Sequence, residues 1–362
     1  MKKILILANK DVGLYKFRKE LIAELLMQGN SIFISLPKGK FVQPLIDMGC
    51  TFINTDVDRR GINPITDLKL LIFYFKLITL VKPDIVITYT IKPNIYGGIV
   101  SGIKKVKYAI NITGLGTAFQ KQGFLKKTIV FLYKIACKKA KVIFFENEDN
   151  KKIFIENQIV SEEKTCKLNG AGVNLEEYNF CQYPVEREKI RFLFVGRIMK
   201  EKGVEELFEV AQQIKRENNN IIFDIVGSIE DQYEERIKIL ELQNIIIYHG
   251  FQENVKPFIK KSHCFVLPSY HEGMANTLLE CGAMGRPLIT SNIHGCLEAV
   301  EVGVNGYLVN VKDADDLYKK IKQFIELPYE KKVEMGRNSR ELIEKKFEKK
   351  QVVEKTVEKL HG

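Results

Sequence analysis

Short apolar runs that resemble buried strands alternate with longer helical patterns along this chain, and this alternation limits its fold more than any other feature. In the first half, helical patterns at Tyr15–Gln28 and Asp67–Val81 separate several of these runs. Strands joined by crossover helices must lie parallel in a sheet whose two faces the helices cover. The runs predicted to be strands are Lys3–Ala8, Ser31–Leu36, Thr51–Asn54, Ile85–Tyr89, Lys107–Ile112 and Val142–Glu146.

The pattern begins again after a loop-like segment at residues 169–184. The strands predicted there are Arg191–Val195, Ile221–Val226, Ile245–Tyr248, Cys264–Leu267 and Leu288–Thr290, with helices at Val204–Glu217 and Asp313–Glu326. A length of 362 residues suits two domains. We therefore predict two Rossmann-like α/β domains, residues 1–170 and 185–344. A charged helix near residues 345–362 is expected to return to the first domain, and a ligand cleft is expected between the domains at the strand ends.

Cysteine content and hydropathy point to the cytoplasm. Seven cysteines without a C-x-x-C pair favour reduced thiols over a disulfide framework or a zinc site. The longest apolar run, Leu70–Val81, is interrupted by Lys76 and is too short to span a bilayer. The apolar start Met1–Ala8 resembles a signal peptide, but no cleavage-type segment follows it, so we interpret it as the first buried strand.

The positive charge is concentrated in the first half of the chain. Residues 1–180 hold 28 Lys and Arg against 16 Asp and Glu, whereas the remainder holds 28 against 29. No nucleic-acid recognition motif accompanies this charge, so nucleic acid is not expected as a partner. The segment Phe124–Lys141 reads as a basic amphipathic helix that suits an anionic membrane surface or a phosphorylated acceptor. A core helix with a solvated lysine face is the alternative.

Two loops that follow predicted strands carry residues suited to a phosphate ligand. After the first strand, Gly13 permits close approach of a ligand to the backbone, although an ordinary βα turn would also explain it. After the strand that opens the second domain, Arg197 and Lys202 could neutralise a diphosphate, with Arg197 as a fork and Lys202 as a point charge. A merely solvated lysine-rich loop is the alternative.

A third loop holds two carboxylates, Glu272 and Glu280, around a small-residue turn that opens a helix after the strand Cys264–Leu267. The first N–H groups of a helix are unpaired and carry partial positive charge, so they favour a phosphate. We expect Glu280 about two turns inside this helix, so that carboxylates on either side of the phosphate could each hold a sugar. The alternative, two unrelated glutamates on a surface helix, is disfavoured by this context. The segment predicts a sugar-nucleotide site.

These motifs together resemble the family-4 glycosyltransferases, retaining enzymes of the GT-B fold, in which two Rossmann-like domains face each other across a cleft. The resemblance rests on G-R-x-x-x-E-K-G at Gly196–Gly203, the E-x7-E at Glu272–Glu280, and Gly303–Tyr307, in the family's order. It implies a nucleotide-sugar donor, UDP-linked, bound by the second domain, and an acceptor bound by the first, with no cofactor.

The resemblance also implies roles for individual residues. Arg197 and Lys202 would bind the donor diphosphate, Glu272 the transferred sugar, Glu280 the ribose, and Phe251 would lie near the base. Gly13 would lie under the pyrophosphate. The catalytic residues implied are Glu272, Arg197 and Lys202, and the donor-binding residues implied are Gly13, Gly196, Phe251, Gly273, Met274, Ala275, Asn276, Thr277 and Glu280.

One departure from the family lies in the first domain, where Thr113 stands in place of a common histidine. The proton acceptor is therefore unassigned, and in the family's front-face mechanism an oxygen of the leaving phosphate can take the proton. The segments Asn111–Gly116, Gln122–Phe124 and Thr90–Gly97 look like a subgroup that elongates saccharides on undecaprenyl diphosphate. This subgroup includes N-acetylgalactosaminyltransferases of protein glycosylation and enzymes of capsule or O-antigen synthesis.

For the acceptor side we predict contacts from Arg18, Lys92 and Thr113, and peripheral attachment of the basic half to the inner face of the cell membrane. The D-x-D at Asp56–Asp58 is interpreted as a loop, so no metal is predicted.

The prediction is thus a retaining, metal-independent hexosyl- or N-acetylhexosaminyltransferase. A nucleotide-sugar 2-epimerase would need acid and base residues at the sugar C2, for which no candidates are found beyond the E-x7-E. A non-catalytic sugar-nucleotide-binding partner would be favoured by loss of Glu272 or Lys202, and both are present.

Overall fold

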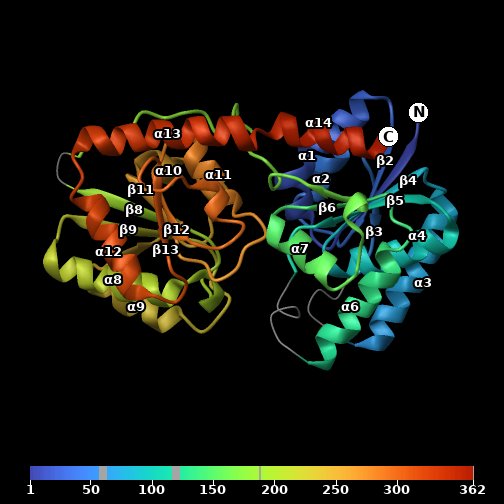
Figure 1. The fold of residues 1–362 in the computed structure, drawn as a ribbon, viewed down its shortest axis with the longest axis horizontal. Helices are drawn as coiled ribbons and strands as arrows, with labels where there is room; N and C mark the ends of the chain where they lie inside the picture. The colour runs from blue at the N-terminus through green and yellow to red at the C-terminus, as the bar shows by residue number, and fades with distance from the viewer. Residues whose placement is uncertain (57–62, 116–122, 187–188, 362) are drawn as a thin grey trace. The chain divides into compact units, whose positions relative to one another are not determined.

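The computed structural model describes residues 1–56, 63–115, 123–186 and 189–361, and it forms two compact units (Figure 1). Unit 1 consists of Met1–Ala171 together with Lys349–Gly362, and unit 2 consists of Gly172–Glu348. Each unit has its own parallel sheet and its own apolar interior. No helix among the described residues is long and apolar enough to cross a bilayer.

Unit 1 is built on a parallel sheet of seven strands in the order β3-β2-β1-β4-β5-β6-β7. The order reverses direction beside β1, which pairs with both β2 and β4, and ligands of such sheets bind where the order reverses. The strands are β1 (Lys3–Leu7), β2 (Ser31–Leu36), β3 (Thr51–Asn54), β4 (Ile85–Tyr89), β5 (Lys107–Ile112), β6 (Val142–Phe145) and β7 (Thr165–Lys167).

Helices cover both faces of the first sheet because its strands alternate their side chains between two apolar clusters. Ile4 and Ile6 pack with α1 and α14, whereas Leu5 and Leu7 pack with α3, α4 and α6. The helices of unit 1 are α1 (Asp11–Met27), α2 (Val42–Asp47), α3 (Pro64–Val81), the π-helical turn η1 (Pro93–Gly97), α4 (Gly98–Lys104), α6 (Phe124–Cys137), α7 (Glu148–Glu156), η2 (Glu162–Lys164) and α14 (Lys349–His361).

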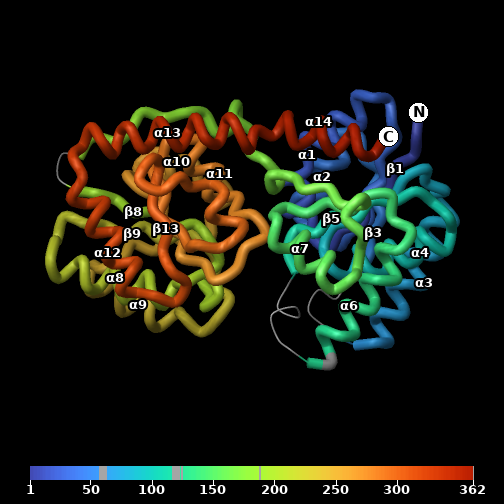
Figure 2. The backbone as a smooth tube through the Cα atoms, viewed as in Figure 1, coloured from blue at the N-terminus to red at the C-terminus, as the bar shows by residue number. Residues whose placement is uncertain are grey.

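Unit 2 has a parallel sheet of six strands in the order β10-β9-β8-β11-β12-β13. Its strands are β8 (Ile190–Val195), β9 (Ile221–Val226), β10 (Ile246–Tyr248), β11 (Cys264–Leu267), β12 (Leu288–Ser291) and β13 (Gly306–Val309). Its helices are η3 (Lys200–Lys202), α8 (Val204–Glu217), α9 (Glu234–Leu242), α10 (Lys256–Lys261), α11 (Asn276–Ala283), η4 (Leu297–Ala299), α12 (Ala314–Ile325) and α13 (Tyr329–Phe347). Figure 2 shows α8 beside α12 and α11 beside α13.

Every strand predicted from the sequence is present, but two short edge strands, β7 and β13, were not predicted. Strand β13 begins with Gly306, where a Cβ would lie 1.9 Å from the Leu288 carbonyl oxygen, so close backbone approach excludes the side chains that usually signal a strand. The first helix also begins earlier than expected, at Asp11, whose carboxylate lies favourably in the first turn. Gly13 therefore lies inside helix α1 and not in a loop before it.

Candidate functional site

The loops that follow β8, β9 and β10 pack against one another at the carboxyl edge of the sheet in unit 2. The Gly227 N–H donates to the Gly250 carbonyl oxygen at 2.9 Å, and the Gly196 N–H donates to the Val226 carbonyl oxygen at 3.0 Å. A Cβ on Gly227 would lie 1.7 Å from the Gly196 carbonyl oxygen, so only glycine fits there. This close packing fixes the start of the Gly196–Gly203 motif.

The end of this motif is fixed by Gly203, which connects η3 to α8 with a φ of 69°. A Cβ at Gly203 would lie 2.0 Å from the Pro268 carbonyl oxygen, just after β11. The motif loop is thus held against the segment that carries the E-x7-E. Two sequence motifs about 70 residues apart come together for this reason.

Lys202 and Glu272 form an ion pair between the two motifs, with the Lys202 Nζ donating to Glu272 Oε1. Their side chains are 17% and 11% exposed, respectively. At this burial each charge depends on the other, because an unpaired charge out of water is costly. An ammonium group has three N–H donors, so the pair still leaves donors of Lys202 for a second acceptor.

Arg197 is held by a residue that the sequence analysis did not identify. Its Nη1 lies 2.7 Å from Oε2 of Glu230, in the loop after β9. The Arg197 side chain is 40% exposed, and a guanidinium has five N–H donors, so further donors remain for a ligand. The available signal was the position of Glu230 shortly after a predicted strand.

Helix α11 begins at Asn276, so Glu280 lies about one turn inside it, and the expected two turns are wrong. Ala275 has a non-helical ψ of 88° and is the N-cap of α11, and its N–H donates to the Gly295 carbonyl oxygen at 2.8 Å. Of the N–H groups from Gly273 to Asn276 that the resemblance assigns to the diphosphate, that of Ala275 is therefore already hydrogen-bonded within unit 2. Met274 and Ala275 are buried, which anchors the turn to unit 2.

Three buried polar atoms near this turn have no hydrogen-bond partner among the described residues. They are Ser269 Oγ, His271 Nε2 and Asn276 Oδ1. A buried polar atom without a partner costs roughly 1–3 kcal/mol, so such atoms mark places where a polar ligand would be stabilising. Ser269 and His271 were not predicted as site residues, although both follow the predicted strand directly.

The remaining predicted donor residues lie on either side of these loops. Phe251 lies in the loop after β10, next to Gly250, and the residue is 61% exposed. Glu280 lies near the phenol of Tyr178. Burial raises the pKa of Tyr178, and the negative charge of the Glu280 carboxylate raises it further. Its predicted role remains a prediction.

In unit 1 the predicted acceptor residue Arg18 is buried and already paired. Its Nη2 lies 2.5 Å from Glu146 Oε1, and the guanidinium stacks over the Tyr89 ring at 5.0 Å. Burial lowers the pKa of Arg18, but the charges of Glu146 and Tyr89 outweigh this effect and raise it. The contact of Arg18 with the acceptor stays a prediction, and the structure shows this side chain engaged with Glu146.

Lys92 is also paired, since its Nζ lies 2.7 Å from Asp67 Oδ1 in α3. Thr113 follows β5 directly and is partly buried. A buried network that we did not predict holds the Lys92–Gly97 segment in place. Asn94 accepts from Thr88 Oγ1 at 2.7 Å and donates to the Asn111 carbonyl oxygen at 2.8 Å.

Some predictions concern residues outside the described part of the chain. Asp58 of the D-x-D, Gly116 and Gln122 lie there, whereas Asp56 is described and exposed. Among the described residues, no group of three or more His, Cys, Asp or Glu is placed to hold a metal ion.

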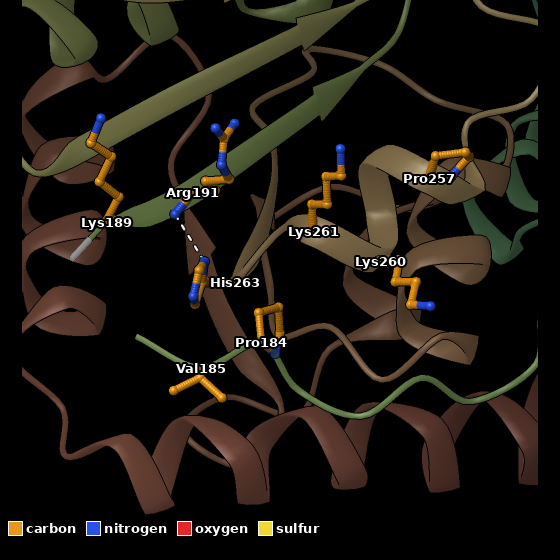
Figure 3. Close-up of a pocket in the computed structure, with 8 residues that line it drawn as sticks. All are labelled: Pro184, Val185, Lys189, Arg191, Pro257, Lys260, Lys261 and His263. Atoms are coloured by element: carbon orange, nitrogen blue, oxygen red, sulfur yellow. Dashed lines mark hydrogen bonds between the residues drawn. The ribbon is translucent and has the colours of Figure 1, made fainter. Parts of the chain in front are cut away.

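A basic pocket of about 520 Å³ lies elsewhere in unit 2, where β8 begins (Figure 3). Its lining includes Lys189, Arg191 and His263, and the Arg191 N–H donates to His263 Nδ1 at 3.0 Å. None of the predicted site residues lines it. The predicted residues therefore gather at the carboxyl edge, and the pocket lies where the strands start.

Comparisons with known proteins match both units. The chain matches the family model "Glycosyl transferase 4-like" over residues 3–147 and the model "Glycosyl transferases group 1" over residues 177–342.

Two curated relatives cover most of the chain. The N,N'-diacetylbacillosaminyl-diphospho-undecaprenol alpha-1,3-N-acetylgalactosaminyltransferase of Campylobacter jejuni is 28% identical over 90% of this chain and 89% of its own. The UDP-Gal:alpha-D-GlcNAc-diphosphoundecaprenol alpha-1,3-galactosyltransferase of Escherichia coli is 31% identical over 71% of this chain and 70% of its own.

Among solved structures, Alr3699/HepE from Anabaena, in complex with UDP and glucose, is similar with a TM-score of 0.81. The identity is 16%, and the match covers 100% of each chain, so this likeness concerns the fold.

Proposed function

The chain belongs to the glycosyltransferases described by the group 1 and 4-like family models, and on this premise we propose that it transfers a hexose or N-acetylhexosamine from a UDP-sugar to a lipid-linked saccharide. The observation that carries the proposal is the Lys202–Glu272 ion pair, which joins two motif loops at the strand ends of unit 2.

We assign the donor diphosphate to Lys202 and Arg197. Departure of a nucleoside diphosphate leaves negative charge on phosphate oxygens, and fixed cations stabilise that charge without reorganisation. The pairing of Lys202 with Glu272 and of Arg197 with Glu230 supports this role, since each cation is held in place and keeps donors for the phosphate. Because these cations can do this work, we propose that the reaction needs no metal.

The sugar and nucleoside are assigned to the neighbouring residues. Glu272 would accept hydrogen bonds from sugar hydroxyls, Glu280 from the ribose, and Phe251 would lie against the base. The N–H groups at the start of α11, with Asn276, would complete the diphosphate contacts. The unpartnered Asn276 Oδ1 and His271 Nε2 support a polar ligand at this turn.

We propose transfer with retention of configuration, as the resemblance to the family implies. An oxygen of the leaving phosphate would take the acceptor proton, because Thr113 has no group of suitable basicity. Unit 1 would bind the acceptor. The names of the Campylobacter jejuni and Escherichia coli relatives both specify acceptors linked to undecaprenyl diphosphate, which supports a lipid-linked acceptor.

The test is a panel of UDP-sugars incubated with polyprenyl-diphosphate saccharides, with the anomeric configuration of the product read by NMR. Transfer should persist in chelator, and Glu272→Ala should abolish most turnover while leaving UDP binding largely intact. A UDP-sugar converted without acceptor would instead indicate an epimerase. Binding of the donor without any turnover across the panel would indicate a non-catalytic binding partner.

A further inference from the structure

Helix α3 has an unusual exposed side. A helix on the surface of a water-soluble protein normally turns polar side chains outward. In α3 the residues exposed at helical spacing include Ile65, Leu68, Ile72 and Phe75, whereas the opposite side is buried in the core. This helix is therefore apolar on both its inward and its outward sides.

Two further helices on this side of unit 1 also carry exposed apolar residues. Helix α4 packs against both α3 and α6, and the three helices lie on one side of unit 1 (Figure 1). The Lys104 Nζ lies 3.7 Å from the centroid of the Phe75 ring, which ties α4 to the exposed side of α3. Helix α6 adds the exposed side chains of Leu125, Phe131 and Ile135. We call this surface the α3–α4–α6 face.

The charged side chains of the three helices are mostly positive. The helices hold the lysines Lys69, Lys76, Lys104, Lys126, Lys127 and Lys134. Asp67 is the one carboxylate in the three helices, and it is ion-paired with Lys92. Within these three helices the exposed apolar side chains are thus accompanied by six lysines and by one carboxylate, which is already paired.

We propose that the α3–α4–α6 face docks on an anionic lipid bilayer, with apolar side chains of α3 and α6 entering the interfacial layer. Contiguous exposed apolar surface marks interaction sites, and interspersed lysines complement the negative potential of anionic lipids. This inference deepens the proposed work on a lipid-linked acceptor, since docking would bring unit 1 to the membrane that holds it. From the sequence we predicted membrane attachment of the basic half and named only the helix at Phe124–Lys141 for it, whereas α3 contributes more exposed apolar residues than α6.

The experiment measures cosedimentation with vesicles of phosphatidylcholine alone or mixed with phosphatidylglycerol. The test variant is Leu68→Gln with Phe131→Gln, whose side chains are 58% and 62% exposed. The matched control is Ile239→Gln with Leu242→Gln in α9 of unit 2, at 53% and 74% exposed. We expect strong binding only to the phosphatidylglycerol vesicles, at least about tenfold weaker binding by the test variant, and no change for the control.

A second pair of variants isolates the charge. Replacing Lys69 and Lys76 with Gln should weaken binding about fivefold per lysine, whereas replacing Lys238 and Lys319 of unit 2 should not. Binding that is the same for both vesicle compositions, or lost equally in the controls, would overturn the proposal. So would a test variant that binds vesicles normally but loses self-association in sedimentation velocity, because the face would then be an interface between copies of this chain.

Failure of docking and failure of the proposed function can be told apart. The Leu68→Gln, Phe131→Gln variant should keep its transfer rate on a short-chain, water-soluble acceptor. Vesicle binding without transfer to any acceptor would contradict the proposed function and leave the docking proposal standing.

Discussion

The two units have similar parallel sheets but handle charge at their carboxyl edges differently. In unit 2, Lys202 and Arg197 pair with Glu272 and Glu230 and stay partly exposed, so both keep donors for a ligand. In unit 1, Arg18 and Glu146 are about nine-tenths buried. We infer from this difference that the cations of unit 2 keep donors that a ligand could use, whereas the ion pair between Arg18 of α1 and Glu146 stabilises unit 1.

The largest effect is expected when one partner of the buried Arg18–Glu146 pair is removed. Arg18→Met leaves Glu146 buried without its partner, and breaking such a pair costs about 3–5 kcal/mol of the free energy of unfolding. Urea unfolding measures the loss, and amide hydrogen exchange assigns it to unit 1. The control, Arg18→Met with Glu146→Leu, should recover most of the stability. A stable Arg18→Met variant with a raised KM for the acceptor would contradict the structural role.

The next largest effect is expected for Lys202, one of the two partly exposed cations of unit 2. Lys202→Ala should lower kcat by roughly 10²–10³, since it removes a fixed donor from the leaving diphosphate, and it should weaken UDP binding. Lys200→Ala, in the same short helix η3, is the matched control and should have little effect. Equal affinity for UDP in the Lys202→Ala variant and the unaltered protein would contradict the assignment.

The buried imidazole of His263 should make the stability of unit 2 depend on pH. Burial lowers the pKa of His263 to about 4, and the positive charges of Arg286 and Lys332 contribute to this shift. The unfolded chain therefore binds more protons between pH 6.5 and pH 4. The contribution of neutral His263 to the free energy of unfolding should be fully present above pH 6.5. The free energy of unfolding should then fall by on the order of 2–3 kcal/mol as the pH drops to 4. Unfolding curves across this range check it, and His263→Gln should lack this dependence.

The smallest effect is expected for Phe251, which we proposed to lie against the base of the donor. Phe251→Ala should raise the KM for the donor about fivefold with little change in kcat, because stacking on a base contributes roughly 1–3 kcal/mol and backbone contacts would remain. Steady-state kinetics with varied donor measures this. An unchanged KM would place the base elsewhere.

The sequence predicted the architecture and the family well for identifiable physical reasons. Strands buried on both faces, such as Ile85–Tyr89, are nearly continuous apolar runs. The parallel sheets and the glycosyltransferase family are confirmed. Edge strand β13 was missed because Gly306 carries no side chain that would signal a strand. The start of α11 was misplaced because the bond between Ala275 and Gly295 is a tertiary contact.

Site residues were harder to predict because partners come from distant loops. Neither the pairing of Arg197 with Glu230 nor the buried pair of Arg18 and Glu146, 128 residues apart, leaves a local pattern in the chain. The outward apolar side of α3 was also missed, since an apolar stretch in sequence does not reveal which residues face water. The motifs thus indicated which loops hold the candidate site residues. Only the three-dimensional contacts show which of their cations are accessible and which are buried.

The most direct test of the central claim is a crystal structure of the protein with a bound UDP-sugar. We expect the diphosphate within hydrogen-bonding distance of the Lys202 Nζ, next to the start of α11, with the sugar at Glu272. A donor bound instead in the basic pocket where β8 begins, with no diphosphate contact to Lys202 or Arg197, would contradict it.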